Sequence, residues 1–156
     1  METVERVIPA PPERIWALVA DPRRHKDING NDTVRDAFDV PEQLTLGSTF
    51  GMNMDFGGAY TMTSTVIEYD DGKRIAWQSR PPAGGARWRH VFGGRIWRYE
   101  LEPVDGGTRV RESWDLTQEG KVVFVRALVW AYRRKTHDNM QQTLDRIERI
   151  VTEKAR

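Results

Sequence analysis

The sequence predicts an α+β fold: a curved antiparallel sheet of about seven strands wrapped on one long C-terminal helix, with two short helices after the first strand. Two observations support this prediction. Residues 121–156 contain no Gly or Pro, so nothing in them interrupts a helix. The middle of the chain instead holds short segments of alternating apolar and polar residues, separated by turns such as Asp70-Asp71-Gly72. Consecutive strands joined by such turns form an antiparallel sheet.

The first 30 residues predict one strand and two short helices. The strand covers residues 4–8 and ends at a run of prolines. Because proline is tolerated at a helix start, an amphipathic helix is predicted at 13–20, where Asp21-Pro22 ends it. The polar segment 23–29 could form a second short helix before the turn at Gly30-Asn31.

Six further strands are predicted between that turn and residue 117. The period of two places apolar side chains on one strand face, as with Trp97 and Tyr99, and charged ones such as Arg98 on the other. The predicted strands cover residues 33–40, 48–54, 60–69, 74–80, 95–102 and 108–117.

The C-terminal helix is predicted as one continuous element. Its second half has a narrow apolar stripe on one face, formed by Met140, Leu144, Ile147, Ile150 and Val151. At about 1.5 Å per residue the helix would be roughly 50 Å long, which exceeds the core of a small domain. It must therefore lie across a wide object, and the predicted sheet is the natural one.

Composition predicts a single domain, residues 1–156, and excludes several classes of protein. Lys plus Arg number 24 and Asp plus Glu 23, so the chain lacks the basic excess typical of nucleic-acid binding. Cys is absent, which excludes disulfides and thiolate sites. The N-terminus lacks a secretory pattern, and the apolar run at 122–132 is too short to span a bilayer. We expect a soluble, cytoplasmic protein without stable membrane insertion.

The element order and several motifs resemble a known superfamily. The opening Val4-x-Arg6-x-Ile8-x-Ala10-x-Pro12 is similar to the start of START-like (SRPBCC) proteins, in particular their bacterial polyketide cyclase/dehydrase branch. Further matches are Ile15-Trp16, Asp21-Pro22, Gly47-x-x-Phe50, Ala76-Trp77, Trp97-x-Tyr99-x-Leu101-x-Pro103 and Gly107-Thr108-x-Val110-x-Glu112. The resemblance covers nearly the whole chain and implies the helix-grip (Bet v 1-like) fold, with a deep cavity between sheet and helix. It does not select a function, because the superfamily includes lipid carriers, cyclases, plant ligand binders and chaperone activators.

Strand alternation together with that layout assigns a set of large side chains to the cavity. Most are aromatic or Met, as in apolar ligand pockets, although any one of them could simply fill the core. The sheet contributes Phe50, Met52, Met54, Tyr60, Met62, Trp77, Trp97, Tyr99, Val110, Glu112 and Trp114, and the helix contributes Phe124, Leu128 and Tyr132.

Glu112 is the most informative of these residues. Its strand neighbours Val110 and Trp114 are predicted to face inward, so its carboxyl also points at the cavity. A buried carboxylate is costly unless it is paired or hydrogen-bonded. Glu112 could anchor a ligand hydroxyl or act as an acid/base candidate alongside Tyr99. It could equally make a structural hydrogen bond to Tyr99, Trp97 or Arg126, and Asp36 carries the same ambiguity.

No metal or cofactor is predicted. His25, His90 and His137 have unrelated spacings and lack the His-x-x-x-His pattern that places two ligands on one helix face. The chain also lacks a Gly-x-Ser-x-Gly elbow. The resemblance implies that an enzyme of the cyclase kind would need no such motif, since cavity shape and a few polar side chains orient the substrate.

Three functions stay open at this point. The first is binding of a medium-sized hydrophobic or amphipathic molecule, such as a lipid, polyketide or isoprenoid, in the cavity. The second is polyketide cyclase/dehydrase-type catalysis on such a ligand. The third is partner binding through the apolar first half of the helix, where Val123 and Trp130 fall off the main stripe and could form a homodimer contact or touch a membrane.

Overall fold

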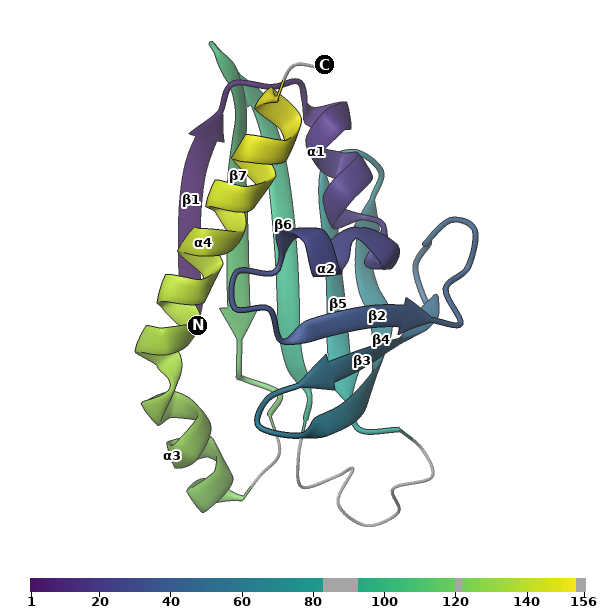
Figure 1. Cartoon of the computed structure of the whole chain (residues 1–156), viewed down its shortest axis with the longest axis vertical. Helices are drawn as coiled ribbons and strands as arrows, with labels where there is room; N and C mark the ends of the chain where they lie inside the picture. The colour runs from purple at the N-terminus through teal and green to yellow at the C-terminus, as the bar shows by residue number, and fades with distance from the viewer. Residues whose placement is uncertain (83–92, 120–121, 154–156) are drawn as a thin grey trace.

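The computed structural model describes residues 1–82, 93–119 and 122–153, and it confirms the predicted α+β architecture. Within these residues seven strands form one antiparallel sheet in the order β1-β7-β6-β5-β4-β3-β2. The C-terminal helical segment runs along the β1 side of this sheet (Figure 1). The strands are β1 (Glu2–Ile8), β2 (Val34–Phe38), β3 (Thr49–Asp55), β4 (Ala59–Asp70), β5 (Arg74–Arg80), β6 (Arg95–Val104) and β7 (Gly107–Asp115).

The short helices follow β1, as the prolines and the Asp-Pro step predict. α1 (Pro12–Val19) starts with a proline and buries Ile15, Leu18 and Val19 against the core. The next segment is a 3₁₀ turn, η1 (Pro22–Arg24), followed by α2 (His25–Ile28). The Asp21 carboxylate accepts a hydrogen bond from the Arg23 N–H at 3.0 Å and so caps η1.

The prediction of one continuous C-terminal helix is wrong. The helix breaks at Tyr132 into α3 (Val123–Ala131) and α4 (Arg133–Thr152). The Tyr132 N–H bonds to the Val129 carbonyl at 3.1 Å, which is the tighter spacing of a 3₁₀ turn. The Tyr132 ring packs edge-on against Phe56, with 6.3 Å between the ring centroids. A tertiary contact with the β3–β4 turn therefore accompanies a break that no Gly or Pro signals.

The second half of the segment has the predicted apolar stripe. Met140, Leu144, Ile147 and Val151 of α4 are all buried. At the edge of the helix, Arg6 of β1 forms ion pairs with Asp145 and Glu148. The buried apolar face thus packs on the sheet, and the ion pairs lie beside it at the first strand.

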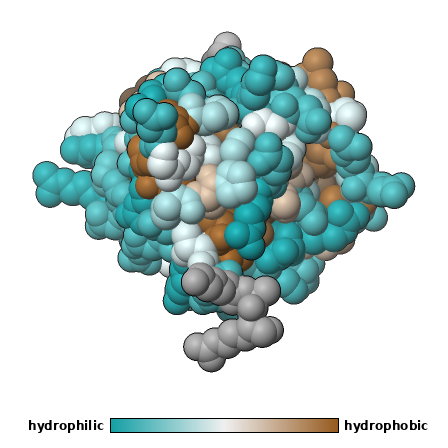
Figure 2. All heavy atoms as spheres, turned by 90° about the horizontal axis from the view of Figure 1, so that it is seen from above, coloured by the Kyte–Doolittle hydropathy of each residue, from teal (hydrophilic) through white to brown (hydrophobic). Residues whose placement is uncertain are grey.

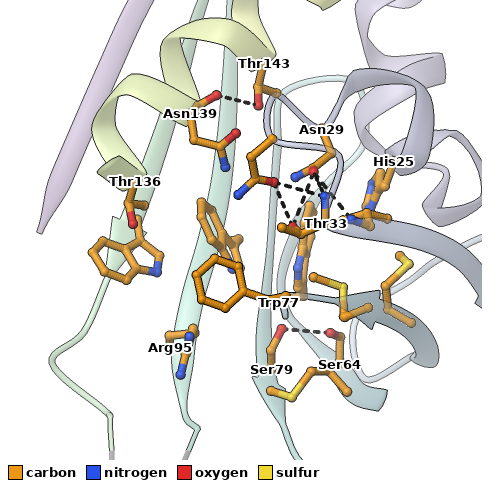
Figure 3. Close-up of a pocket in the computed structure, with 18 of the residues that line it drawn as sticks. His25, Asn29, Thr33, Ser64, Trp77, Ser79, Arg95, Thr136, Asn139 and Thr143 are labelled. Carbon is orange, nitrogen blue, oxygen red and sulfur yellow. Dashed lines mark hydrogen bonds between the residues drawn. The ribbon is translucent and has the colours of Figure 1, made fainter. Parts of the chain in front are cut away.

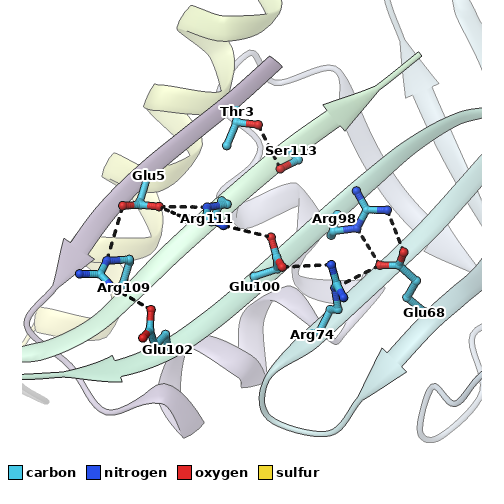
Figure 4. A network of polar contacts seen from close by, with 10 residues as sticks. All are labelled: Thr3, Glu5, Glu68, Arg74, Arg98, Glu100, Glu102, Arg109, Arg111 and Ser113. Carbon is cyan, nitrogen blue, oxygen red and sulfur yellow. Dashed lines mark hydrogen bonds and ion pairs between the residues drawn. The ribbon is translucent and has the colours of Figure 1, made fainter. Parts of the chain in front are cut away.

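The outer face of the sheet is charged. Side chains of β1, β4, β5, β6 and β7 form a chain of ion pairs across it (Figure 4). The best-formed pair is Arg98–Glu68, in which Nε and Nη2 of the guanidinium donate to the two carboxylate oxygens at 2.7 and 2.8 Å. This hydrogen bonding lowers the pKa of Glu68. Exposed pairs stabilise a fold little, but their position identifies the other face as the core side. The chain of pairs joins Glu5, Arg111, Glu100, Arg74, Glu68 and Arg98.

Gly30 lies where the loop after α2 touches α4 most closely. Its N–H donates to the Thr143 hydroxyl at 3.1 Å. A Cβ at this position would clash with the Asn139 carbonyl and would lie 2.7 Å from the Gln142 Cβ. We expect Gly30→Ala to lower the free energy of unfolding by about 1–3 kcal/mol, measured by urea denaturation. Lys26→Ala, at an exposed position of α2, should change it by less than about 0.5 kcal/mol. Equal stability of the two variants would show that the loop does not contact α4 this closely.

Candidate ligand-binding cavity

A cavity of about 530 Å³ lies between the inner face of the sheet and the helices. Four exposed lining residues lie where α3 and α4 meet the β3–β4 turn, which marks the mouth: Phe56, Tyr60, Tyr132 and Lys135. The floor is made by side chains that are almost fully buried, among them Phe50, Tyr99, Glu112 and Trp114. The described residues thus form a pocket that opens to solvent at this mouth.

Most of the side chains that strand alternation assigned to the cavity do line it. The inner faces of β3 and β4 supply the methionines, and those of β5, β6 and β7 supply the aromatic floor. Val110 is buried in the core beside the cavity and does not line it. The lining residues named from the sequence are Phe50, Met52, Met54, Tyr60, Met62, Trp77, Trp97, Tyr99, Glu112, Trp114 and Tyr132.

The predicted inward orientation of Phe124 and Leu128 is wrong. Phe124 is 76% exposed and Leu128 is 51% exposed, and neither lines the cavity. Val125 and Val129, one helix position further on, take the inward face of α3 instead. Adjacent residues on a helix point about 100° apart, so when Val125 and Val129 face inward, Phe124 and Leu128 cannot.

Glu112 sits on the floor with its carboxyl fully enclosed. The Tyr99 hydroxyl donates to Glu112 Oε1 at 3.0 Å, while Oε2 has no hydrogen-bond partner. Burial raises the pKa of the Glu112 carboxyl to about 8, against the smaller opposing effect of the Tyr99 hydrogen bond. Burial and the nearby carboxylate raise the pKa of Tyr99 well above its usual value. Glu112 can therefore hold or release a proton close to neutral pH.

The wall beside Glu112 is a series of ring contacts. His25 stacks on Trp77 with 4.9 Å between ring centroids, and Trp77 lies 5.9 Å from Tyr99. Trp97 and Trp114 of neighbouring strands form a second tilted pair at 6.1 Å. These rings give the cavity flat apolar surfaces, on which ring-containing ligands pack well.

His25 is a lining residue that the sequence did not identify as one. The sequence places it in a short polar helix without metal-ligand spacing, whereas the structure buries the ring in the cavity wall (Figure 3). His25 Nε2 lies 2.9 Å from the Val19 carbonyl, which can only accept, so Nε2 carries the proton. Burial lowers the pKa of His25, which keeps the ring neutral.

The sequence also missed the polar residues that the loop after α2 and the helix α4 bring to the rim. Asn29 Oδ1 accepts from the Thr33 N–H at 3.0 Å, and the Thr143 hydroxyl donates to the Asn139 carbonyl at 3.0 Å (Figure 3). The Asn139 side-chain oxygen is buried without a partner. Only tertiary packing places these residues together, although the i, i+4 spacing of Asn139 and Thr143 puts them on one helix face.

Two further polar pairs complete the lining. On neighbouring strands, the hydroxyls of Ser64 and Ser79 lie 2.9 Å apart in a buried hydrogen bond (Figure 3). Arg95 bonds through Nε and Nη2 to the buried carboxylate of Glu119, at 3.2 and 3.3 Å. Glu119 also accepts from the Gly93 N–H at 2.9 Å. The charge of Arg95 is therefore already paired within the fold.

The remaining candidates do not join this site. Asp36 is exposed and accepts from Asn53 at 3.3 Å, because β2 shifts its register between Val34 and Ala37. His137 lies beside Glu2, and His90 falls outside the described residues. In the described parts of the chain, no cluster of three or more His, Asp or Glu side chains is placed to hold a metal ion.

The helix α3 exposes most of its apolar side chains next to the mouth. Val123 is 80% exposed and Trp130 is 59% exposed. The guanidinium of Arg133 lies 3.6 Å from the centre of the Trp130 ring. The opposite end of the molecule, where α1 and the end of α4 lie, is mostly hydrophilic with scattered apolar side chains (Figure 2). A group of exposed apolar side chains thus adjoins the cavity entrance.

None of the helices within residues 1–82, 93–119 and 122–153 is both long and apolar enough to cross a membrane.

Comparison with solved structures identifies the fold. A protein from Chromobacterium violaceum, CV1439, aligns with a TM-score of 0.71 at 17% identity, over 98% of this chain and 97% of that one. Ara h 8.0201 aligns with a TM-score of 0.65 at 14% identity, over 96% of this chain and 95% of that one. At these identities the likeness establishes the Bet v 1-like fold alone.

Sequence comparison establishes the family. The uncharacterized protein Rv0088 of Mycobacterium tuberculosis is 35% identical over 117 residues, which are 74% of this chain and 47% of that protein. The chain thus spans about half the length of the curated relatives it matches. Residues 2–152 match the family model described as polyketide cyclase / dehydrase and lipid transport. The predicted resemblance is confirmed, and the chain belongs to the polyketide cyclase / dehydrase and lipid transport family.

Proposed function

We propose that this protein binds one medium-sized hydrophobic or amphipathic molecule, of the lipid, polyketide or isoprenoid kind, in the cavity between sheet and helices. The observation that carries the proposal is a volume of about 530 Å³ left unfilled among large aromatic and Met side chains. Pockets for small organic ligands have volumes of roughly 300–1,000 Å³ and similar apolar walls. A fold that needed these side chains only as core would close around them, because protein interiors are packed densely.

Native mass spectrometry of the purified full chain tests this proposal. We expect a second species heavier than the bare chain by one small molecule, and organic extraction should release a compound of low polarity. A chain that stays bare after incubation with fatty alcohols, polyketide aromatics and isoprenoids would argue against a binding function.

A second candidate is catalysis of the cyclase/dehydrase type, favoured by the protonation state of Glu112. A carboxyl with a pKa of about 8, bonded to a Tyr hydroxyl on the cavity floor, can give or take a proton at neutral pH. The cavity would supply the orientation of the substrate. If a turnover is found for the co-purifying class of molecule, Glu112→Gln should reduce kcat by at least about 100-fold. Unchanged kcat would exclude this role.

Partner binding through α3 is favoured by its exposed apolar side chains. Partner binding, dimerisation included, would use this surface rather than the cavity. Sedimentation velocity of the wild type and Trp130→Ser should then differ in the dimer fraction. Identical monomer profiles at high concentration would exclude homodimerisation through Trp130.

A further inference from the structure

Two polar atoms on the cavity floor have no hydrogen-bond partner. Glu112 Oε2 and Trp114 Nε1 are both buried and both unpaired. They belong to residues two positions apart on β7, whose side chains line the cavity from the same face of the sheet. Buried polar groups in folded proteins are paired in the great majority of cases, so two unpaired atoms in the lining of one cavity need an explanation. A ligand that supplies the missing partner provides one.

The two atoms define what that partner must be. An indole N–H can only donate a hydrogen bond, so the ligand atom facing Trp114 must accept. A carboxyl accepts when it is ionised and donates when it is protonated. A hydroxyl or phenol oxygen satisfies both groups in either state of Glu112. A ketone oxygen satisfies Trp114 and a protonated Glu112.

The same surroundings disfavour a ligand carboxylate. The two long cationic side chains in the described lining are Arg95 and Lys135, and neither is available at the floor. Arg95 is paired with Glu119, and Lys135 is an exposed residue at the mouth, 5.3 Å from the centre of the Phe56 ring. His25 donates its Nε2 proton to the Val19 carbonyl. A carboxylate buried next to Glu112 would lose its hydration without gaining a counter-charge.

We propose that the cavity selects ligands whose buried end carries an uncharged oxygen, in the first place a hydroxyl or phenol, with Trp114 Nε1 and Glu112 Oε2 as its hydrogen-bond partners. This inference rests on the proposed binding function and names its ligand class. The stacked rings of His25, Trp77 and Tyr99 further favour a flat aromatic skeleton beside that oxygen.

Three probes with one ring system test this selection: 2-naphthol, 2-naphthoate and 2-methylnaphthalene. Affinities would be measured for the full chain at pH 7 by fluorescence titration. Because its hydroxyl can make two hydrogen bonds that a methyl group cannot, 2-naphthol should bind at least about ten-fold more tightly than 2-methylnaphthalene. The charged naphthoate should bind most weakly of the three.

Conservative variants test whether the indole N–H of Trp114 causes the preference for 2-naphthol. Trp114→Phe keeps a ring but removes the N–H, so 2-naphthol should lose most of its advantage while 2-methylnaphthalene binds as before. Trp16→Phe, in α1, is the control, because Trp16 is also a tryptophan but does not line the cavity. It should leave the preference intact.

Each other outcome overturns the inference in a distinguishable way. Equal binding of the three probes, tight binding of naphthoate, or an unchanged preference in Trp114→Phe would refute the selection and leave the binding function standing. Failure of all three probes to bind, 2-methylnaphthalene included, would refute both the selection and the proposed function on which it rests.

Discussion

Glu112→Gln should produce a protein that is more stable than the wild type above pH 8 and about equally stable near pH 4.5. Glutamine has nearly the shape of a protonated glutamic acid, and its oxygen can still accept the hydrogen bond from Tyr99. It lacks only the ionisation that burial makes costly. The effect should therefore depend on pH rather than shift stability by a constant amount.

The direction in which wild-type stability changes with pH follows from the pKa values of Glu112 in the unfolded and folded states. The carboxyl titrates at 4.5 in an ordinary environment and at about 8 in the folded protein. Between these values the folded state holds a proton that the unfolded state has lost, so wild-type stability falls as pH rises through this window and stays reduced above it. At about 1.4 kcal/mol per pKa unit, the full difference is on the order of 5 kcal/mol. Glu112→Gln should escape this loss.

Urea denaturation of both proteins at pH 5, 7 and 9 measures the difference. The advantage of the variant should grow steadily across the series. Tyr99→Phe serves as a second test, because the hydrogen bond from Tyr99 is the one effect that lowers the pKa of Glu112. Without this hydrogen bond the pKa of Glu112 should rise further, so the loss of stability should continue to a higher pH than in the wild type. Parallel pH profiles for wild type and Glu112→Gln would show that Glu112 is not enclosed.

Met62→Trp should weaken ligand binding at least about ten-fold without unfolding the protein. Met62 points from β4 into the cavity, so the larger indole would occupy space that is otherwise open. We expect the affinity for a neutral fluorescent probe, N-phenyl-1-naphthylamine, to fall at least about ten-fold, which is about 1.4 kcal/mol. The thermal midpoint should change little, because the added atoms enter a cavity rather than a packed core.

The neighbouring residue offers a matched control. Thr63 follows Met62 on the same strand, so its side chain points to the other face of the sheet, and it does not line the cavity. Thr63→Trp should bind the probe like the wild type. If Met62→Trp also bound normally, the probe would occupy a site outside the cavity.

Strand periodicity gave the sheet side of the site from sequence alone. On β7 the alternation of Val110, Glu112 and Trp114 with charged residues leaves only one face for the core, and the structure places all three on that face. A one-residue register error would have reversed the whole set, and the charged side chains of Arg109, Arg111 and Asp115 on the alternate positions exclude that error.

The side of α3 that faces the cavity could not be predicted from the sequence pattern. Nearly every residue of α3 is apolar, so no polar face indicated which side turns inward, and Phe124 and Leu128 were assigned to the wrong one. The break at Tyr132 is accompanied by a contact with Phe56, a residue far away in the sequence, and no Gly or Pro marks it. His25 and Asn139 reach the cavity only because separate helices pack together, and local patterns carry no signal of that packing.

Binding of a ligand inside the cavity is tested most directly by ¹H–¹⁵N NMR. The indole N–H signals of the tryptophans would be followed during a titration with N-phenyl-1-naphthylamine. Signals would be assigned with Trp→Phe variants. If the ligand enters the cavity, the signals of Trp97 and Trp114 should shift while those of Trp16 and Trp130, which do not line it, stay in place. A shift at Trp130 with Trp114 unchanged would place binding on the surface of α3 and contradict the cavity function.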